Sequence, residues 1–213
     1  HANDIYLALK KKDISDKNFV YISLNADCFK ILSSGMKIHF FDKITKKLFK
    51  KEVVSKKIYD DCNNQLLLFE NTIKKINLSK ILISMKWLDN DIENLDYLVN
   101  YFSNYFVKKN IYIFSRRLEI PHIERSLIKI GSNVEKIRDY FQKNKILFND
   151  KNKRLKAKSK NLDINWVDIN KIICIKECKF FHENKLTYSD SSHFTLTGGK
   201  IFLDIFLKKY NLN

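Results

Sequence analysis

Residues 80–115 read KILISMKWLDNDIENLDYLVNYFSNYFVKKNIYIFS. The stretch begins and ends with short apolar runs, at 80–87 and 111–115, and runs of this kind predict buried strands. Between them, residues 91–110 repeat their apolar side chains at helical spacing, which predicts an amphipathic helix. A strand, a helix and a second strand in this order are typical of parallel strands joined by a covering helix.

The same alternation continues on both sides of this stretch. We expect further strands at 18–24 and 162–169, and helices at 60–77, at 132–144 with a continuation through 147–160, and at 197–210. A small cysteine-bearing hairpin precedes the last helix. The pattern predicts the α/β class: a three-layer α/β/α sandwich with a central, mainly parallel sheet. With no repeat and no Gly/Ser/Pro-rich linker, we expect one domain over residues 1–213.

In parallel sheets, ligands bind beyond the carboxyl ends of the strands. We therefore expect the functional residues in the segments that follow the predicted strands. These segments are 25–28, 86–91 and 115–122, together with the loop 188–196.

The net charge of +16 comes from lysines spread along the whole chain. The many Asn, Ile, Phe and Tyr residues are typical of an AT-rich genome, so we expect no specific nucleic-acid partner. The one dense basic run, KNKRLKAKSK (151–160), we interpret as a solvated helix face. A basic nucleic-acid-binding domain, with steep salt dependence, stays open as an alternative. No apolar run approaches the roughly 20 residues that cross a bilayer, and residues 1–12 do not resemble a signal peptide.

The four cysteines lie at positions 28, 62, 174 and 178. Their spacing does not match a zinc site, so we expect no metal and no cofactor. An even number is compatible with the disulfides Cys28–Cys62 and Cys174–Cys178 in an oxidising compartment. Free buried thiols in a reducing compartment fit the spacing equally well, and both interpretations stay open.

The loop YSDSSHFTLTGG (188–199) holds the strongest chemical signal, and two of the chain's four glycines. Asp190 and His193, three positions apart, can meet so that the carboxylate holds one imidazole nitrogen and the other faces outward, as in a Ser-His-Asp triad. The glycines let the chain enter the last helix without a Cβ in the way. The alternative is a helix cap, in which Thr195 or Thr197 caps the helix, Asp190 binds turn amides and His193 is an incidental surface residue.

The run LTYSDSSHFTLTGGKIF (186–202) resembles the last block of the SGNH (GDSL-like) hydrolases. It is closer still to the SGNH domains fused to membrane acyltransferase-3 proteins, which O-acetylate bacterial surface polysaccharides. Other landmarks of that group follow in order, so the resemblance covers essentially the whole chain: YISLNADCFKI (21–31), KILISMKW (80–87), IYIFSRRLEIPHI (111–123) and IICIKECKFFHENKLTYSD (172–190). The resemblance implies that Asp190 and His193 are catalytic.

The first four residues, HAND, resemble the tail of the family's Gly-Asp-Ser-His-Ala nucleophile motif. On this resemblance the domain is truncated just after that motif, and the nucleophilic serine lies immediately before His1. We then expect the 213 residues alone to be nearly inactive. The alternative is that His1 remains from a purification tag.

The superfamily's usual oxyanion donors, a glycine and an asparagine, have no obvious counterpart here. The candidates for the oxyanion or substrate site are Asn25, Lys86 and Trp87, and Lys86-Trp87 matches what acyltransferase-linked members carry after this strand. The alternative for Trp87 is a core tryptophan. We expect Arg116 and Arg117 either in a solvated loop or against a carboxylated sugar, and we consider His122 as a wall of the site.

The resemblance implies transfer of an acetyl group to a hydroxyl of a cell-surface polysaccharide. With water as acceptor, the same groups make a carbohydrate acetylesterase, and a catalytically inactive carbohydrate-binding relative is a further alternative. The implied partners are the carbohydrate acceptor, an acyl donor and a membrane acyltransferase-3 domain. The domain is then expected on the extracytoplasmic side as a soluble part of a membrane protein, a location that favours the two disulfides.

Overall fold

The computed structural model describes residues 28, 56–76, 78–174 and 177–210. Strands β1 (Ile81–Ile83), β2 (Ile111–Phe114) and β3 (Asn165–Val167) form a parallel sheet in the order β1-β2-β3. In its register, Ile81 lies opposite Ile111 and Tyr112 lies opposite Asn165. The predicted α/β class and the three predicted strands in this part of the chain are confirmed. The strand predicted at 18–24 lies outside the described residues.

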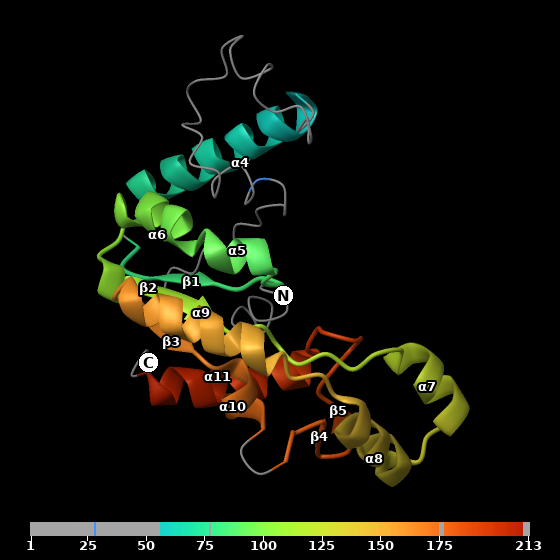
Figure 1. Ribbon diagram of the computed structural model, residues 1–213. Coiled ribbons are helices and arrows are strands. Elements are labelled where there is room, and N and C mark those ends of the chain that lie inside the picture. Colours follow the sequence, from blue (N-terminus) through green and yellow to red (C-terminus); the bar gives the residue numbers. More distant parts are fainter. Residues whose placement is uncertain (1–27, 29–55, 77, 175–176, 211–213) are drawn as a thin grey trace.

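Alternate side chains of β2 face two separate hydrophobic clusters, one on each side of the sheet. Ile111 and Ile113 join the cluster formed by α4 (Lys56–Lys75), α5 (Asp89–Glu93), α6 (Leu95–Ser103) and Leu155 of α9 (Asn149–Asn161). Tyr112 and Phe114 join the cluster that holds α10 (Ile169–Ile173) and α11 (Leu196–Lys209). Figure 1 shows α5 and α6 on one side of the sheet and α10 and α11 on the other, which gives the three layers.

The single helix predicted at 91–110 is divided in the structure. It consists of α5, α6 and a 3-10 turn, η1 (Lys108–Asn110), and it starts earlier than predicted. The Asp91 carboxylate accepts a hydrogen bond from the Leu88 amide (2.8 Å), which closes the first turn. Asn94 is the last cap of α5 and the first of α6, and both its amide (3.1 Å) and its side chain (3.0 Å) donate to the Asn90 carbonyl. Asparagine favours local side-chain bonds of this kind at helix ends.

The chain runs from β2 to α7 (Ile123–Ile130). On the same side of the molecule as α7 lie α8 (Val134–Asn144) and the antiparallel hairpin of β4 (Phe181–His182) and β5 (Lys185–Leu186) (Figure 1). The hairpin was expected, whereas α7 and α10 were not. The helix predicted at 132–144 is α8, and its predicted continuation at 147–160 is a separate helix, α9. After α8, Ile146 pairs with Glu119, and Phe148 takes a left-handed conformation (φ 50°) before α9 begins.

The basic run 151–160 lies in α9, and basic side chains on one side of that helix pair with acidic side chains of α5 and α6. Lys151 and Arg154 both contact the Asp89 carboxylate, and Lys158 lies 3.1 Å from Asp96. The expectation of a solvated face is therefore correct for only part of the run. These ion pairs fasten α9 to α5 and α6.

All four cysteines form disulfides, Cys28–Cys62 and Cys174–Cys178, so the structure holds the first of the two alternatives left open by their spacing. Cys28 and Cys62 are buried in the cluster around α4 and α6. Cys174–Cys178 closes a short turn between α10 and the hairpin. Within the described ranges, no helix combines the length and apolarity of a membrane span, and no group of His, Cys, Asp and Glu side chains is arranged to hold a metal ion.

Candidate active site

Asp190 and His193 lie in the loop between β5 and α11 and are in direct contact, as predicted. Oδ2 of Asp190 lies 2.7 Å from Nδ1 of His193. Oδ1 of the same carboxylate accepts hydrogen bonds from the backbone amides of Ser192 (2.8 Å) and His193 (2.9 Å). One oxygen thus orients the imidazole while the other shapes the loop that carries it.

The carboxyl group of Asp190 is held in its charged form. Partial burial by itself raises its pKa, but hydrogen bonds from the Ser192 amide, the His193 ring and the His193 amide outweigh this, and the pKa lies below its ordinary value. A carboxylate at Nδ1 favours the tautomer with its proton on that nitrogen. Nε2 then carries the lone pair that a general base needs.

The capping contacts of the helix-cap alternative are also present, beside the Asp-His pair. Thr195 is the N-cap of α11: its hydroxyl accepts from the Gly198 amide (3.2 Å) and donates to the Leu186 carbonyl (2.7 Å). The turn before it is closed by a bond from the Ser189 amide to the His193 carbonyl (2.9 Å). Thr195 therefore caps the helix, while Asp190 binds the turn amides through one carboxylate oxygen and the His193 ring through the other.

Gly198 allows α11 to approach the segment before the loop. A Cβ on Gly198 would lie 2.0 Å from the Thr187 carbonyl oxygen. The glycine is thus needed for a close backbone contact, which fixes the start of α11 and, through it, the loop.

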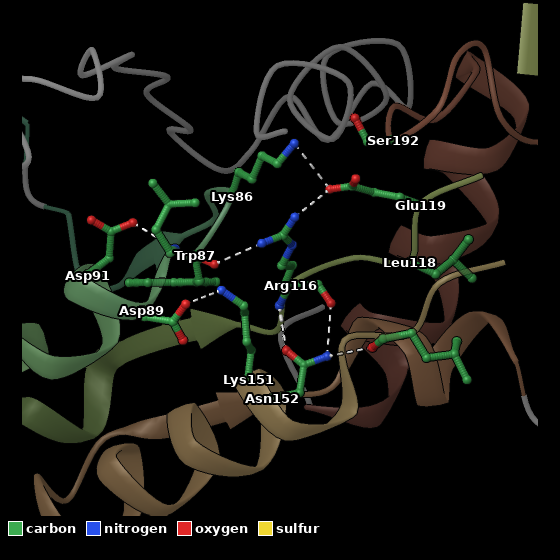
Figure 2. Close-up of polar contacts among 12 residues, drawn as sticks. Lys86, Trp87, Asp89, Asp91, Arg116, Leu118, Glu119, Lys151, Asn152 and Ser192 are labelled. Carbon is green, nitrogen blue, oxygen red and sulfur yellow. Dashed lines mark hydrogen bonds and ion pairs between the residues drawn. The ribbon is translucent and has the colours of Figure 1, made fainter. Parts of the chain in front are cut away.

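Arg116 and Arg117, directly after β2, are buried, with 7% and 3% of their surfaces exposed. The expectation of a solvated loop or of a sugar contact is wrong for both. The Arg116 guanidinium donates to the Trp87 carbonyl (3.2 Å), pairs with Glu119 (3.0 Å) and lies 3.6 Å from the centre of the Phe148 ring. Figure 2 shows Arg116 between Trp87 and Glu119.

Side-chain amides hold the backbone where the sheet ends. Oδ1 of Asn152 accepts from the Arg116 amide (2.8 Å), and its Nδ2 donates to the Arg116 carbonyl (3.0 Å) (Figure 2). Asn170 accepts from the Leu118 amide (2.9 Å). These contacts replace a neighbouring strand, so the segment after β2 is fixed beyond the sheet.

The substrate-site candidates separate into different environments. Trp87 is fully buried and its indole donates to the Phe114 carbonyl (2.7 Å), the environment expected for the alternative of a core tryptophan. Lys86 has a half-exposed side chain, 3.5 Å from Glu119 (Figure 2). Asn25 and His1 lie outside the described residues, and their roles stay predictions.

A pocket of about 310 Å³ adjoins the Asp-His loop and is lined by His122, Ile123, Glu124, Arg125 and Ser191. His122, which we considered as a wall of the site, is the N-cap of α7 in a left-handed conformation (φ 55°) and lines this pocket. Glu124 and Arg125 were missed because α7 was not predicted. The apolar spacing of Ile123, Leu127 and Ile130 after Pro121 is the signal that indicates this helix.

Comparison with known proteins agrees with this geometry. The chain matches the family described as "SGNH domain (fused to AT3 domains)" over residues 33–208. No curated protein and no solved structure matches it. The match spans most of the chain and includes the segments 86–91 and 115–122 after the strands, and the Asp-His loop. The chain therefore belongs to the family of SGNH domains that are fused to AT3 domains.

Proposed function

We propose that this SGNH domain transfers an acetyl group to a sugar hydroxyl through a Ser-His-Asp triad, with His193 as general base and Asp190 as its orienting acid. The family supports acyl-transfer or esterase chemistry in general. The observation that carries the proposal is the 2.7 Å contact between Asp190 Oδ2 and His193 Nδ1, in a loop with a pocket beside it. The nucleophile is the serine that the motif at His1–Asp4 implies, immediately before His1.

In the first half of the reaction, His193 Nε2 takes the serine proton while the serine oxygen attacks the carbonyl of the acyl donor. The protonated histidine then gives this proton to the departing group, which leaves an acetylated serine. In the second half, His193 takes a proton from the acceptor hydroxyl, and that oxygen attacks the acetyl carbonyl. The serine leaves with the proton from His193. Asn25 and Lys86 are our candidates for the groups that contact the developing oxyanion or the substrate.

The pocket beside the loop suits a sugar. Its lining supplies a guanidinium and a hydroxyl as donors, a carboxylate as acceptor, and an imidazole that can be either. A polyhydroxylated ring presents both donors and acceptors, so this mixed lining matches it. We therefore place the acceptor, a hydroxyl of a cell-surface polysaccharide, in this pocket. With water as acceptor, the same groups would release acetate.

We further propose that the domain works beside a membrane acyltransferase-3 domain on the extracytoplasmic side of the membrane. The family's fusion to AT3 domains supports the partner. The two disulfides support the side, because disulfides persist in oxidising compartments.

The test uses a longer chain that includes the natural residues before His1. It is treated with a serine-directed fluorophosphonate, and the adduct is detected by intact mass and located by peptide mapping. His193→Ala is compared with His182→Ala, a half-exposed histidine in the hairpin that serves as matched control. We expect one adduct, on the residue before His1, in the native chain and in His182→Ala. Labelling should slow at least about 100-fold in His193→Ala.

Equal labelling of native and His193→Ala chains would contradict the proposed base, and no labelling of the native chain would contradict the enzyme. Acceptor choice is tested with p-nitrophenyl acetate in the presence and absence of surface oligosaccharide. Acetylated sugar is expected. Release of acetate alone would identify an esterase, and oligosaccharide binding without any labelling would identify an inactive carbohydrate-binding relative.

A further inference from the structure

The two buried arginines after β2 make the same kinds of contact with different loops. Arg116 donates to the Trp87 carbonyl in the loop after β1 and lies over the Phe148 ring. Arg117 donates from Nη1 to the Ser192 carbonyl (3.2 Å) and lies 4.1 Å from the centre of the Phe194 ring. Ser192 and Phe194 are the residues directly before and after His193.

Resting on the proposed function, we propose that Arg117 is a positioning residue that holds His193 in its orientation toward Asp190. The Ser192 carbonyl belongs to the peptide unit that leads into His193, and a hydrogen bond from a charged donor restrains that unit more strongly than a neutral one. The cation–π contact with Phe194 restrains the residue that follows. The backbone of His193 is thus fixed from both sides, and Asp190 then sets the ring.

Two further observations support this role. The Ile120 amide donates to the Ser191 carbonyl (2.8 Å), so the segment that begins at Arg117 contacts the loop at a third point. Burying a guanidinium costs desolvation energy, and an apolar side chain of similar volume would fill the same space without that cost. The charged contact therefore contributes more than packing, because it fixes the position of the loop's carbonyl.

The imidazole ring of His193 can report whether the contact of Arg117 holds the loop in place. Which imidazole nitrogen carries the proton is set by the hydrogen bond that the ring makes. The pair with Asp190 selects the Nδ1–H tautomer, and a loop that has moved away loses this selection. The tautomer of His193 can be read from long-range ¹H–¹⁵N spectra of the ¹⁵N-histidine-labelled chain, recorded over a series of pH values so that the neutral ring is observed.

Three variants of the 213-residue chain test the proposal, with His193→Gln used to assign the signals. Arg117→Met removes the charge, Arg117→Lys keeps it without the planar stack, and Arg116→Met is the matched control. The backbone at Arg116 is held by Asn152, so this control removes a neighbouring buried guanidinium, with its ion pair to Glu119, without releasing the segment. Thermal unfolding of each variant measures the general structural cost.

We expect the Nδ1–H tautomer in the native chain and in Arg116→Met, its loss in Arg117→Met, and partial recovery in Arg117→Lys. Both methionine variants should unfold at similarly lowered temperatures. In the longer chain, Arg117→Met should label with fluorophosphonate roughly 10- to 100-fold more slowly, as small misplacements of a catalytic group do.

A native Nδ1–H signal in Arg117→Met would overturn the positioning role, because the guanidinium would then only support the fold. Failure of both Arg117 variants to fold, with Arg116→Met folded, would overturn it in the same way. Absence of the Nδ1–H tautomer in the native chain would instead contradict the Asp-His pair itself, and with it the proposed function.

Discussion

Asp190 uses its two carboxylate oxygens for different purposes, and a substitution can separate them. In Asp190→Asn, the side-chain carbonyl can still accept from the Ser192 and His193 amides, whereas the anion at Nδ1 of His193 is lost. We expect the loop to stay folded and fluorophosphonate labelling of the longer chain to fall by up to about 10⁴-fold, as in serine-protease triads with the same change. A labelling rate near the native one would contradict the role of Asp190.

The lowered pKa of Asp190 also predicts how the stability of the fold depends on pH, and the same variant tests this. Because the pKa of Asp190 in the folded chain lies below its ordinary value, ionised Asp190 stabilises the fold above the ordinary carboxyl pKa of about 3.9. This stabilisation is lost as the pH falls through the lowered folded pKa. Urea unfolding at a series of pH values should show a stability gap between native and Asp190→Asn chains at neutral pH that closes in acid. A gap that stays constant into acid would contradict the assignment.

The sequence indicates which residues stand at the strand ends better than it indicates what surrounds them. Asp190 and His193 are close in sequence, so their contact follows from local spacing. Nothing in the sequence indicated that Arg116 and Arg117 are buried, because the rings that cover them, Phe148 and Phe194, come from distant parts of the chain. Trp87 was ambiguous for the same reason.

At the scale of elements, the docking of α11 depends on Gly198. Helix propensity alone favours alanine over glycine by about 1 kcal/mol. The 2.0 Å approach of a Cβ to the Thr187 carbonyl predicts the opposite sign for Gly198→Ala, a loss of about 1–3 kcal/mol from overpacking. Urea unfolding decides between them, with Lys200→Ala, an exposed position in the same helix, as control. A stabilised Gly198→Ala chain would show that the contact relaxes without cost.

Element type was easier to predict than element limits. Apolar spacing identified β2, α8 and α11, because each buries one face or both. It did not show the break at Asn94, or the separation of α8 from α9, where Ile146 pairs with Glu119. The separation of α8 from α9 is therefore a tertiary effect that a local pattern does not contain.

At the scale of the whole molecule, the disulfides join parts of the chain over different distances. Cys28–Cys62 spans 34 positions and Cys174–Cys178 spans 4. Loop-closure entropy predicts losses of about 3–4 kcal/mol for the pair Cys28→Ala/Cys62→Ala and about 2 kcal/mol for Cys174→Ala/Cys178→Ala. Denaturant unfolding of the two double variants measures the difference. Thiol titration of the unfolded, unreduced native chain should find no reactive thiol, and about four would contradict both bridges.

The α/β class was predictable because alternation of strands and helices is visible in the chain itself, as residues 80–115 show. The arrangement of loops at the sheet edge was not, because Asn152, Asn170 and the two arginines act there across large separations in sequence.

Arg116 and Arg117 are neighbours whose guanidinium groups contact different loops, and this restricts how the sequence can change in evolution. Substitutions elsewhere in the segment leave each arginine on its own side. Insertion of a single residue between Phe114 and Arg116 would shift Arg116 into the place of Arg117 and Arg117 into that of Leu118, whereas a deletion would shift Arg117 into the place of Arg116. Either change leaves one of the two loops without its guanidinium. In descendants of this chain, spacing between β2 and the arginine pair should therefore be kept more strictly than the identity of the residues around it.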